Sequence, residues 1–452
     1  MKKKIVLIGS GSQYTEFFLQ EVFKFEEFKG CTIALVDRNR SRLDIVMGIA
    51  QKLNSITDWG VIFEGSIDRR EVLHDAMLVY CFIAVDSKRT WKEDFNLCEK
   101  HGISEYECQT TGVGGLSEAI RHVPPVLDLC ADMEQLCPGA WLVLNNNPLS
   151  KILAAVLTHT KVKAFGYCYG HELVEMALEQ ILGMTERDAS TLKAGHVERE
   201  YMCPAGNLNV KQVGINHMLW VTDIRDTKTG EDLYPKLRQL LASGNNDTIP
   251  AAYRFCAELG RLFGYFATPA DNHVADYMWI DDDDTILRYG LTKIPVDDWF
   301  GGRDDSAWEA IAKSIVNAES AKAFIGQRRT GWLSTHICVS MFSGQPNYFP
   351  EINVINNGAV PNLSSNIIVE VPGVIGPDFV KPIQMDPLPE YLKPVCELHG
   401  TLSNLAGNAA ALGSKDLALQ YLLYYPKIGG VNKAQKVLDD IIALNKPYNT
   451  RF

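Results

Sequence analysis

The sequence is short of positive charge. Its 44 lysine and arginine residues are outnumbered by 55 aspartate and glutamate residues, which gives a formal net charge of −11. Nucleic acids and anionic membranes attract proteins through a basic face, and no basic cluster of that kind stands out along this chain. We therefore expect neither a nucleic acid nor a membrane as a partner.

Long apolar runs are also missing. A bilayer-spanning helix needs roughly 18 or more apolar residues, and no stretch approaches that length. The opening MKKKIVLIGS has the basic residues of an export signal, but its apolar run IVLI stops well short of the roughly 7–15 residues that a signal core needs. The opening therefore predicts a first β-strand and not an export signal.

Paired cysteines are the third absence. The 11 cysteines form no CxxC motif and follow no regular spacing. An odd, scattered set without an export signal indicates free thiols in a reducing compartment, so we expect a cytoplasmic protein. Low-complexity linkers and internal repeats are absent too. A chain of 452 residues with 46% hydrophobic residues is an ordinary globular protein, long enough for more than one domain.

The first half of the chain does contain a series of short apolar runs separated by helical patterns. These runs lie at 4–9, 32–37, 61–65, 77–85, 141–147 and 163–168. Near-continuous apolar strands that alternate with helices are typical of a parallel sheet covered on both faces. We therefore predict an α/β fold whose N-terminal domain, residues 1–195, is a Rossmann-like doubly wound parallel sheet.

The pattern changes in the second half. Residues 196–224 contain strand-like runs with turn residues between them, which indicates antiparallel pairing. Helical stretches follow at 232–264, 305–325, 386–424 and 431–446, with a strand-rich part near 350–372. The expected second domain, residues 196–452, is therefore an α+β domain that completes the site and mediates oligomerisation.

The turn after the first run, IGSGSQYT, has most of a dinucleotide-binding fingerprint. Gly9 permits a tight turn, Gly11 lets a pyrophosphate approach the backbone, and the helix that starts after Ser12 favours negative charge. The third glycine is missing, since Tyr14 stands in its place. Asp37, at the end of the next strand, can accept hydrogen bonds from a ribose and would repel a 2′-phosphate, so NAD is preferred to NADP. A plain strand-turn-helix is the alternative.

Five stretches together resemble glycoside hydrolase family 4. They are GSGS (9–12), QTTGVGGLSEAIRHVP (109–124), NNNPLS (145–150), FGYCYGHE (165–172) and VGINHMLWVTDI (213–224). The segment 352–376 is also similar to the family's late strand region, so the resemblance runs in order from residue 4 to about residue 445. This family comprises NAD- and manganese-dependent glycosidases, which do not use the usual pair of carboxylates. The resemblance also implies a homodimer or homotetramer.

The resemblance assigns ligands to the metal and the cofactor. It implies that Cys168 and His217 bind the divalent ion, and that Asn145 contacts NAD. It further implies that Asn147 and Asn216 contact sugar hydroxyls. From their chemistry alone, a thiolate and an imidazole suit a borderline-soft ion such as zinc or manganese. Without the surrounding motifs, however, a lone cysteine and a lone histidine so far apart in sequence would more often be core residues.

The resemblance also implies an unusual route to hydrolysis. NAD takes a hydride from C3 of the sugar, a base removes the acidified C2 proton, and the metal acts as a Lewis acid toward the resulting anion. The glycosidic group leaves by elimination, water adds, and C3 is reduced again, so no net redox change occurs. Cleavage by elimination can in principle accept α, β and even sulfur linkages.

The segment FGYFATPADNHVADYM (263–278) aligns with the family segment that carries the base. Asp271 is the expected base, with Tyr265 and then Tyr277 as the alternatives, because other members use a tyrosine. An aspartate before a helical pattern is also a good helix cap, and the two roles are compatible. His273 is expected to orient the substrate or Asp271.

The leaving-group acid is where the sequence departs from the family. Tyr169 follows the metal cysteine where other members have aspartate, histidine or asparagine, and Gln109 replaces an acidic residue of the glycine-rich loop. A tyrosine, with an ordinary pKa near 10, is a weak proton donor at neutral pH unless its neighbours shift it. Either His171 or Glu172 would then serve as the acid, or the natural leaving group needs little protonation.

Three questions stay open at this level. No phosphate-clamping group is evident, which favours an unmodified or acidic hexoside over a 6-phosphosugar. Arg121 matches a recurrent family arginine that would face the nicotinamide or the substrate, and a surface salt bridge is its alternative. The chain could instead be a dehydrogenase of the lactate/malate type, which has the same architecture but needs no metal. It could also be a catalytically weak sugar- or nucleotide-binding relative, given Tyr169 and Gln109.

Overall fold

The computed structural model describes residues 3–185, 192–193, 196–197, 206–244, 247–299, 305–326, 332–449 and 451–452. The domain boundary expected at residue 195 therefore lies outside the described residues. None of the described helices combines the length and the hydropathy that a membrane crossing requires.

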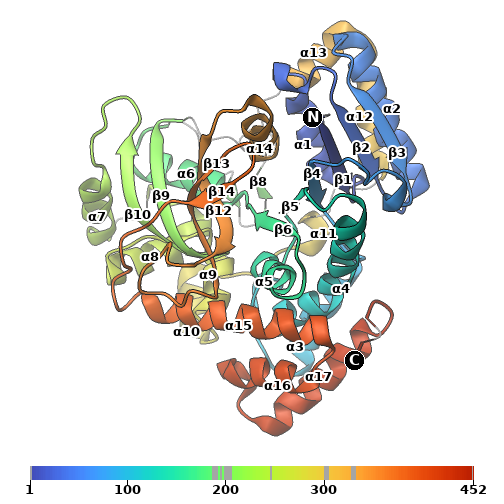
Figure 1. Ribbon diagram of the computed structural model, residues 1–452. Helices are drawn as coiled ribbons and strands as arrows, with labels where there is room; N and C mark the ends of the chain where they lie inside the picture. The colour runs from blue at the N-terminus through green and yellow to red at the C-terminus, as the bar shows by residue number, and fades with distance from the viewer. Residues whose placement is uncertain are drawn as a thin grey trace.

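One mixed sheet runs through the molecule in the order β11-β10-β9-β13-β12-β6-β5-β4-β1-β2-β3, with β14 beside β13 (Figure 1). Its strands in the first half are β1 (Lys4–Ile8), β2 (Thr32–Val36), β3 (Ile62–Ser66), β4 (Leu78–Cys81), β5 (Trp141–Leu144) and β6 (Lys163–Gly166). Those in the second half are β9 (Leu208–Ile215), β10 (Met218–Asp226), β11 (Ala267–Thr268), β12 (Asn347–Ile355), β13 (Ile368–Ile375) and β14 (Val380–Pro382). A separate short pair consists of β7 (Leu192–Lys193) and β8 (His196–Val197).

The first half is the doubly wound Rossmann domain that the apolar runs predict. Strands β1 to β6 are parallel, and five of the six predicted runs contain one of them, while β3 extends one residue beyond the run 61–65. The helices of this half are α1 (Gln13–Val22), α2 (Arg40–Thr57), α3 (Ser87–Lys100), α4 (Gly112–Leu136), α5 (Leu149–His159) and α6 (Gly170–Ile181). Because successive side chains of a strand point to opposite faces, Ile5 and Leu7 pack with α1 and α2, while Val6 and Ile8 pack with α4 and α5.

The second half is the predicted α+β part, and it extends the same sheet. Strand β12 pairs antiparallel with β6, and β9 pairs antiparallel with β10 in a hairpin. Its helices are α7 (Tyr234–Ala242), α8 (Arg254–Phe263), α9 (Asp271–Tyr277), α10 (Asp283–Tyr289), α11 (Val296–Trp299), α12 (Asp305–Ser314), α13 (Ala318–Gly326), α14 (Trp332–Ser343), α15 (Lys393–Leu412), α16 (Lys415–Tyr424) and α17 (Val431–Asn445). Short 3₁₀ turns are η1 (Glu26–Phe28), η2 (Arg69–Glu71), η5 (Ala251–Tyr253) and η6 (Pro426–Ile428).

Helices of the second half return to cover the first half. In Figure 1, α12 and α13 lie beside α2 and α1, and α14 also packs on α1. On the other side, α15 packs against α4 and α5, and α17 packs against α3 and α4. The indole Nε1 of Trp308, on α12, donates a hydrogen bond of 3.0 Å to the carbonyl of Gly11. The second half therefore reaches the glycine-rich loop directly.

Candidate metal and nucleotide site

The candidate site lies at the carboxyl ends of the parallel strands. Gly9 follows β1, Asp37 follows β2, Asn145 follows β5 and Cys168 lies just beyond β6. Open α/β sheets bind their ligands at this edge, in the crevice where the strand order reverses. Here the order reverses between β1 and β4, next to the glycine-rich loop.

The glycine-rich loop has the backbone that a dinucleotide requires. Gly9 has a φ of +82°, and a Cβ there would lie only 2.8 Å from the carbonyl oxygen of Phe82. The amide of Gly11 donates a 2.7 Å hydrogen bond to Asp37 Oδ2, so a carboxylate lies directly above the loop. Ser12 is the N-cap of α1, and its Oγ accepts from the amide of Tyr14. The loop thus opens onto a helix N-terminus, which favours a phosphate group.

Two asparagines of NNNPLS extend the site along the sheet edge. Asn145 donates from Nδ2 to the carbonyl of Tyr167 at 2.9 Å, while its buried Oδ1 has no hydrogen-bond partner among the described residues. Buried polar atoms are nearly always bonded, so this oxygen is available to a ligand. Asn147 donates from Nδ2 to Gln109 Oε1 at 2.6 Å. The glutamine that replaces the expected acid therefore orients a predicted sugar-binding residue.

The two predicted metal ligands meet although 49 positions separate them in sequence. Cys168 Sγ lies 3.6 Å from His217 Nε2. His217 occupies the tight turn between β9 and β10, with a φ of +68°. A sulfur and a nitrogen bound to one tetrahedral zinc ion, at about 2.3 Å and about 2.1 Å, lie about 3.6 Å apart. The spacing of this pair therefore fits a shared divalent ion.

Glu107 and His273 complete this cluster, and the sequence motifs do not single out Glu107. Glu107 Oε1 lies 3.6 Å from His217 Nδ1, and the rings of His217 and His273 have centroids 4.6 Å apart. One ligand atom from each of the three residues lies within 4.8 Å of the other two. One hint of Glu107 was available in the sequence: Gln109 stands where family members have an acidic residue, so a nearby residue could supply the missing carboxylate.

The electrostatics of the cluster follow from its burial and its charges. Burial alone would lower the pKa of His217, but Cys168 and Glu107 raise it to about 10. Burial alone would raise the pKa of Glu107, but the two histidines and Thr110 lower it to about 2. Burial, and then the neighbouring His217, lower the pKa of His273 to about 3. The ring of His217 therefore lies between two groups, Cys168 and Glu107, that both favour its protonated form.

Asp271, the expected base, caps a neighbouring helix. Its carboxylate accepts the amides of Phe255 at 2.9 Å and Cys256 at 2.8 Å, at the start of α8. The sequence suggested that Asp271 caps the helix that it precedes, α9. In the structure its carboxylate caps α8 instead. Burial raises the pKa of Asp271 to about 6, against the lowering effect of the α8 amides. A carboxylate with such a pKa is suited to accept a proton near neutral pH.

The two alternative bases lie in different surroundings. Tyr265 packs beside Tyr234 and Arg238, both on α7, with the guanidinium 5.7 Å from its ring centroid. Tyr277 donates from its hydroxyl to the carbonyl of Asn216 at 2.9 Å, so it supports the turn that carries His217. Of the two, within the part of the chain that the structure describes, only Tyr277 contacts the turn that carries His217.

The candidates for the leaving-group acid are held by protein groups. The ring of Tyr169 stacks on Tyr14 with centroids 5.1 Å apart, and its hydroxyl lies 3.3 Å from that of Tyr167. Burial raises the pKa of Tyr169 well above its usual value, which makes it a still weaker acid. His171 has a partner at each ring nitrogen, Glu175 at 2.9 Å and Gln212 at 2.8 Å.

Asn216 and Arg121 both take part in buried networks. Asn216 donates from Nδ2 to Glu370 Oε2 at 2.8 Å. Arg121 is fully buried and pairs with Asp94 at 2.5 Å and Glu118 at 3.0 Å. The alternative reading of Arg121 as a surface salt bridge is therefore wrong. Because α3, α4 and α17 enclose the side chain, its guanidinium is engaged inside the protein and no contact brings it to the cluster of Cys168 and His217.

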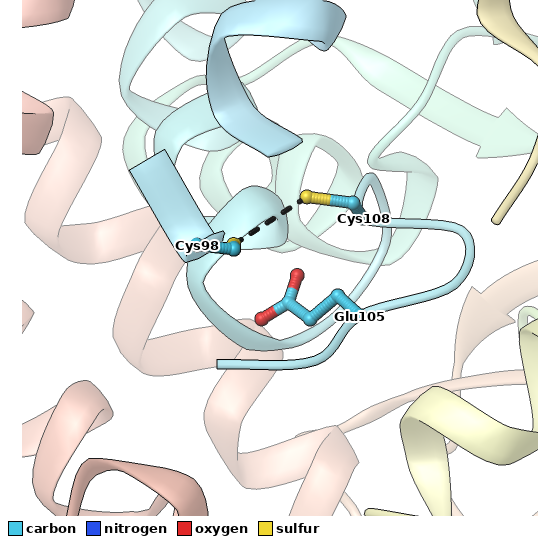
Figure 2. A group of neighbouring side chains, drawn as sticks. All are labelled: Cys98, Glu105 and Cys108. Carbon is cyan, nitrogen blue, oxygen red and sulfur yellow. Dashed lines mark hydrogen bonds between the residues drawn. The ribbon is translucent and has the colours of Figure 1, made fainter. Parts of the chain in front are cut away.

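A second group of potential metal ligands lies at the segment that precedes α4 and contains Glu107. Figure 2 shows Cys98, from α3, facing Cys108 across the loop, with a sulfur-sulfur distance of 3.7 Å, and Glu105 beside them. Glu105 accepts the amides of Val113 at 2.6 Å and Gly114 at 3.1 Å, so its carboxylate caps α4. Burial raises the pKa of the Cys98 thiol to about 12, which keeps it protonated. This group is accordingly part of the core and of the cap of α4.

Comparisons with known proteins place the chain among glycosidases. Residues 4–184 match the Family 4 glycosyl hydrolase description, and residues 212–428 match the Family 4 glycosyl hydrolase C-terminal domain. An alpha-galactosidase of Bacillus subtilis (strain 168) is 27% identical over 448 residues, which cover 98% of this chain and 96% of the relative. An alpha-glucosidase of Erwinia rhapontici is 26% identical over 473 residues, which cover 99% of each.

Solved structures share the fold. A 6-phospho-alpha-glucosidase from gut microorganisms, in complex with NAD and Mn²⁺, superposes with a TM-score of 0.78 at 19% identity, covering 99% of this chain and 98% of that one. The 6-phospho-beta glucosidase from Thermotoga maritima, with manganese, NAD⁺ and glucose-6-phosphate, has a TM-score of 0.77 at 18% identity, covering 99% of each chain. With both halves matched, the chain belongs to the family 4 glycosyl hydrolases.

Proposed function

We propose that this chain hydrolyses glycosides with NAD and a divalent metal, by oxidation at C3 of the sugar, removal of the C2 proton, elimination, addition of water and re-reduction. The observation that carries the proposal is the pairing of Cys168 Sγ with His217 Nε2 at 3.6 Å beside a dinucleotide loop. A dehydrogenase of the lactate/malate type has no need of such a pair. The NAD and Mn²⁺ named with the two solved glucosidases support the choice of cofactors.

The chain's own residues fit both groups. Gly9 and Gly11 give NAD close access to the backbone, Asp37 can accept from its ribose, and Asn145 Oδ1 is a buried acceptor at the sheet edge. NAD supplies the acceptor, and later the donor, of the C3 hydride. Cys168 and His217 would hold the ion, which supplies Lewis acidity to the sugar oxygens.

Asp271 is the proposed base for the C2 proton, with its carboxylate oriented by two amides of α8. Asn147 and Asn216, whose side chains donate to Gln109 and Glu370, are the proposed hydrogen-bond partners of sugar hydroxyls. Because Tyr169 is a weak acid here, glycosides with acidic leaving groups such as nitrophenol are the appropriate first substrates. The names of the relatives suggest a panel of α-galactosides and α-glucosides, each with and without a 6-phosphate.

Gly11→Val should abolish NAD binding. A Cβ at this position would lie 2.7 Å from Asp37 Oδ2, and the rest of the side chain would occupy the space that the pyrophosphate needs. Titration calorimetry with NAD measures the effect. Gly139→Val is the matched control, because a Cβ there meets open space. An unchanged NAD isotherm for Gly11→Val would refute this placement of the cofactor.

Substrate deuterated at C2 and turned over in ordinary water should give product that has lost the label. Displacement by paired carboxylates leaves C2 untouched and would retain it. Asp271→Asn should slow both exchange and hydrolysis by at least about 100-fold, within the range for loss of a general base, because an amide cannot accept the proton. Mass spectrometry of the product measures the exchange, with NAD and Mn²⁺ present.

The control for Asp271→Asn separates loss of a base from loss of a cap. Asp282 caps the exposed start of α10 by accepting from the amide of Thr285 at 2.8 Å. Asp282→Asn makes the same chemical change in a cap of the same type and should leave hydrolysis at the wild-type rate. Wild-type exchange in Asp271→Asn would place the base elsewhere. Full retention of deuterium by the wild-type protein would overturn the elimination route.

A further inference from the structure

The loop before α4, residues 105–111, is anchored from α9. Asp276 accepts the backbone amides of Tyr106 at 2.8 Å, Glu107 at 2.8 Å and Cys108 at 3.0 Å. The same helix carries His273, which lies against His217. Three amides fixed by one buried carboxylate hold the backbone of this loop in one place, beside the candidate metal cluster.

The side chain of Glu107 is divided between its own loop and the cluster. Oε2 accepts the amides of Gln109 at 3.2 Å and Thr110 at 2.9 Å, and also the Thr110 hydroxyl at 2.7 Å. These bonds leave Oε1 toward His217 Nδ1, at 3.6 Å. Only 1% of Glu107 is exposed. Its orientation is therefore set by the protein and not by solvent.

Glu107 and Cys168 approach opposite edges of one imidazole ring. Cys168 Sγ faces Nε2, and Glu107 Oε1 faces Nδ1. Cys168 and Nε2 would hold the ion, whereas Glu107 faces the other ring nitrogen and would support the histidine from behind. A metal-binding histidine usually donates its other N–H to a carboxylate, which fixes its tautomer and raises its basicity.

We propose that Glu107 is the positioning residue of the metal histidine in this enzyme. His217 Nδ1 has no hydrogen-bond partner among the described residues, and Glu107 Oε1 faces it at 3.6 Å. By closing this short gap to accept the Nδ1 proton, Glu107 would leave the Nε2 lone pair for the ion that Cys168 and His217 would hold. It also supplies the negative charge that Gln109 lacks, from two positions earlier in the same loop. The proposal rests on the proposed function, because it assumes that Cys168 and His217 hold the ion.

The test measures metal binding and not only activity. Metal-free protein is titrated with Mn²⁺ while free Mn²⁺ is followed by electron paramagnetic resonance, and Co²⁺ is used to report the thiolate-to-metal absorption. Glu107→Gln keeps the size of the side chain and removes its charge. It should weaken Mn²⁺ binding by about 10- to 100-fold and leave NAD affinity unchanged. The Co²⁺–thiolate band should persist at saturation, because Cys168 remains a ligand.

Glu175→Gln is the matched control, since Glu175 also pairs with a buried histidine, His171 at 2.9 Å, but not with the metal pair. Its Mn²⁺ affinity should equal that of the wild-type protein. If Glu107→Gln fails to fold, Glu107→Asp replaces it: the shorter side chain can still accept amides two or three residues ahead but withdraws from His217. Either variant, folded and with wild-type Mn²⁺ affinity, would overturn the role of Glu107.

The two proposals fail in distinguishable ways. Wild-type protein that binds Mn²⁺ tightly, with a Co²⁺–thiolate band that Cys168→Ser removes, confirms the metal pair whatever Glu107→Gln does. An unaffected Glu107→Gln then contradicts only the positioning role. Wild-type protein without metal affinity, or without a thiolate band, contradicts the metal pair itself and with it both proposals.

Discussion

Cys168→Ser is expected to abolish metal-dependent glycoside hydrolysis and to weaken Mn²⁺ binding by more than about 100-fold. That loss would exceed the one expected from changing a residue that only supports a metal ligand. A thiol ionises readily beside a metal, whereas a serine hydroxyl stays protonated near neutral pH and is a poor ligand. Cys168 is also the half-exposed member of the free cysteines among the described residues. Peroxide should therefore inactivate the enzyme by oxidising this thiol, and reductant should reverse the early stages.

The control for this result is a buried cysteine that belongs to the hydrophobic core and not to the candidate metal site. Cys137, buried at the end of α4, should tolerate serine without a change in Mn²⁺ affinity. Hydrolysis of nitrophenyl glycosides and the Mn²⁺ titration give the two measurements. Activity that survives both exhaustive chelation and Cys168→Ser would show that the thiol serves the structure alone.

Arg121→Met should lower the free energy of unfolding by about 3–5 kcal/mol, the usual cost of removing one partner from a buried ion pair. The variant leaves Asp94 and Glu118 without their cation in a place where neither side chain reaches solvent. Asn445 would also lose the guanidinium that donates to its Oδ1 at 2.6 Å. Urea unfolding followed by circular dichroism measures the loss.

The deficit of this variant should shrink at lower pH. Burial already raises the pKa of Asp94 to about 7, despite the lowering effect of Arg121. Without Arg121 that pKa rises further, so the folded state keeps a proton that the unfolded chain loses above about pH 4. Up to about pH 7 the wild-type protein keeps this proton as well, so both proteins lose stability in parallel, and above about pH 7 only the variant continues to lose it. The gap between variant and wild type should be smaller at pH 5.5 than at pH 7.5.

An exposed arginine provides the comparison for Arg121. Arg225 pairs with Asp223 at 3.0 Å on the surface, and its side chain is 45% exposed. Arg225→Met should change the unfolding free energy by no more than about 0.5 kcal/mol, as exposed ion pairs usually do. A change of similar size for Arg121→Met would mean that the buried network is solvated in solution.

The first half of the fold was predictable because each of its strands carries its own signal. Runs such as 4–9 and 32–37 have an unbroken apolar centre, as strands covered on both faces must, and each leads into a helical pattern. The β9–β10 hairpin was equally visible from its turn residues. The pairing of β12 with β6 was not, because it joins Asn353 to Gly166 across a long sequence separation that no local pattern records.

The site was predictable only where the motifs of the family mark it. Cys168 and His217 lie in such motifs, and the structure brings them together. Glu107 has no motif of its own: in EYEC its carboxylate could have faced solvent. Contacts from elsewhere in the chain orient the loop, among them Asp276, which accepts the Glu107 amide, and Trp91, whose Nε1 donates to the Glu107 carbonyl. Arg121 shows the converse, since its motif suggests a ligand contact while the partners that enclose it come from α3 and α17.

The bond from Trp308 to the carbonyl of Gly11 has a kinetic consequence. In an ordinary dehydrogenase the dinucleotide leaves after every turnover, so its loop must release it often. The proposed hydrolase would return its hydride within one cycle and would have no need of that exchange. A loop tied to α12, a helix from the other half of the chain, is suited to retain its dinucleotide as a resident group through many turnovers.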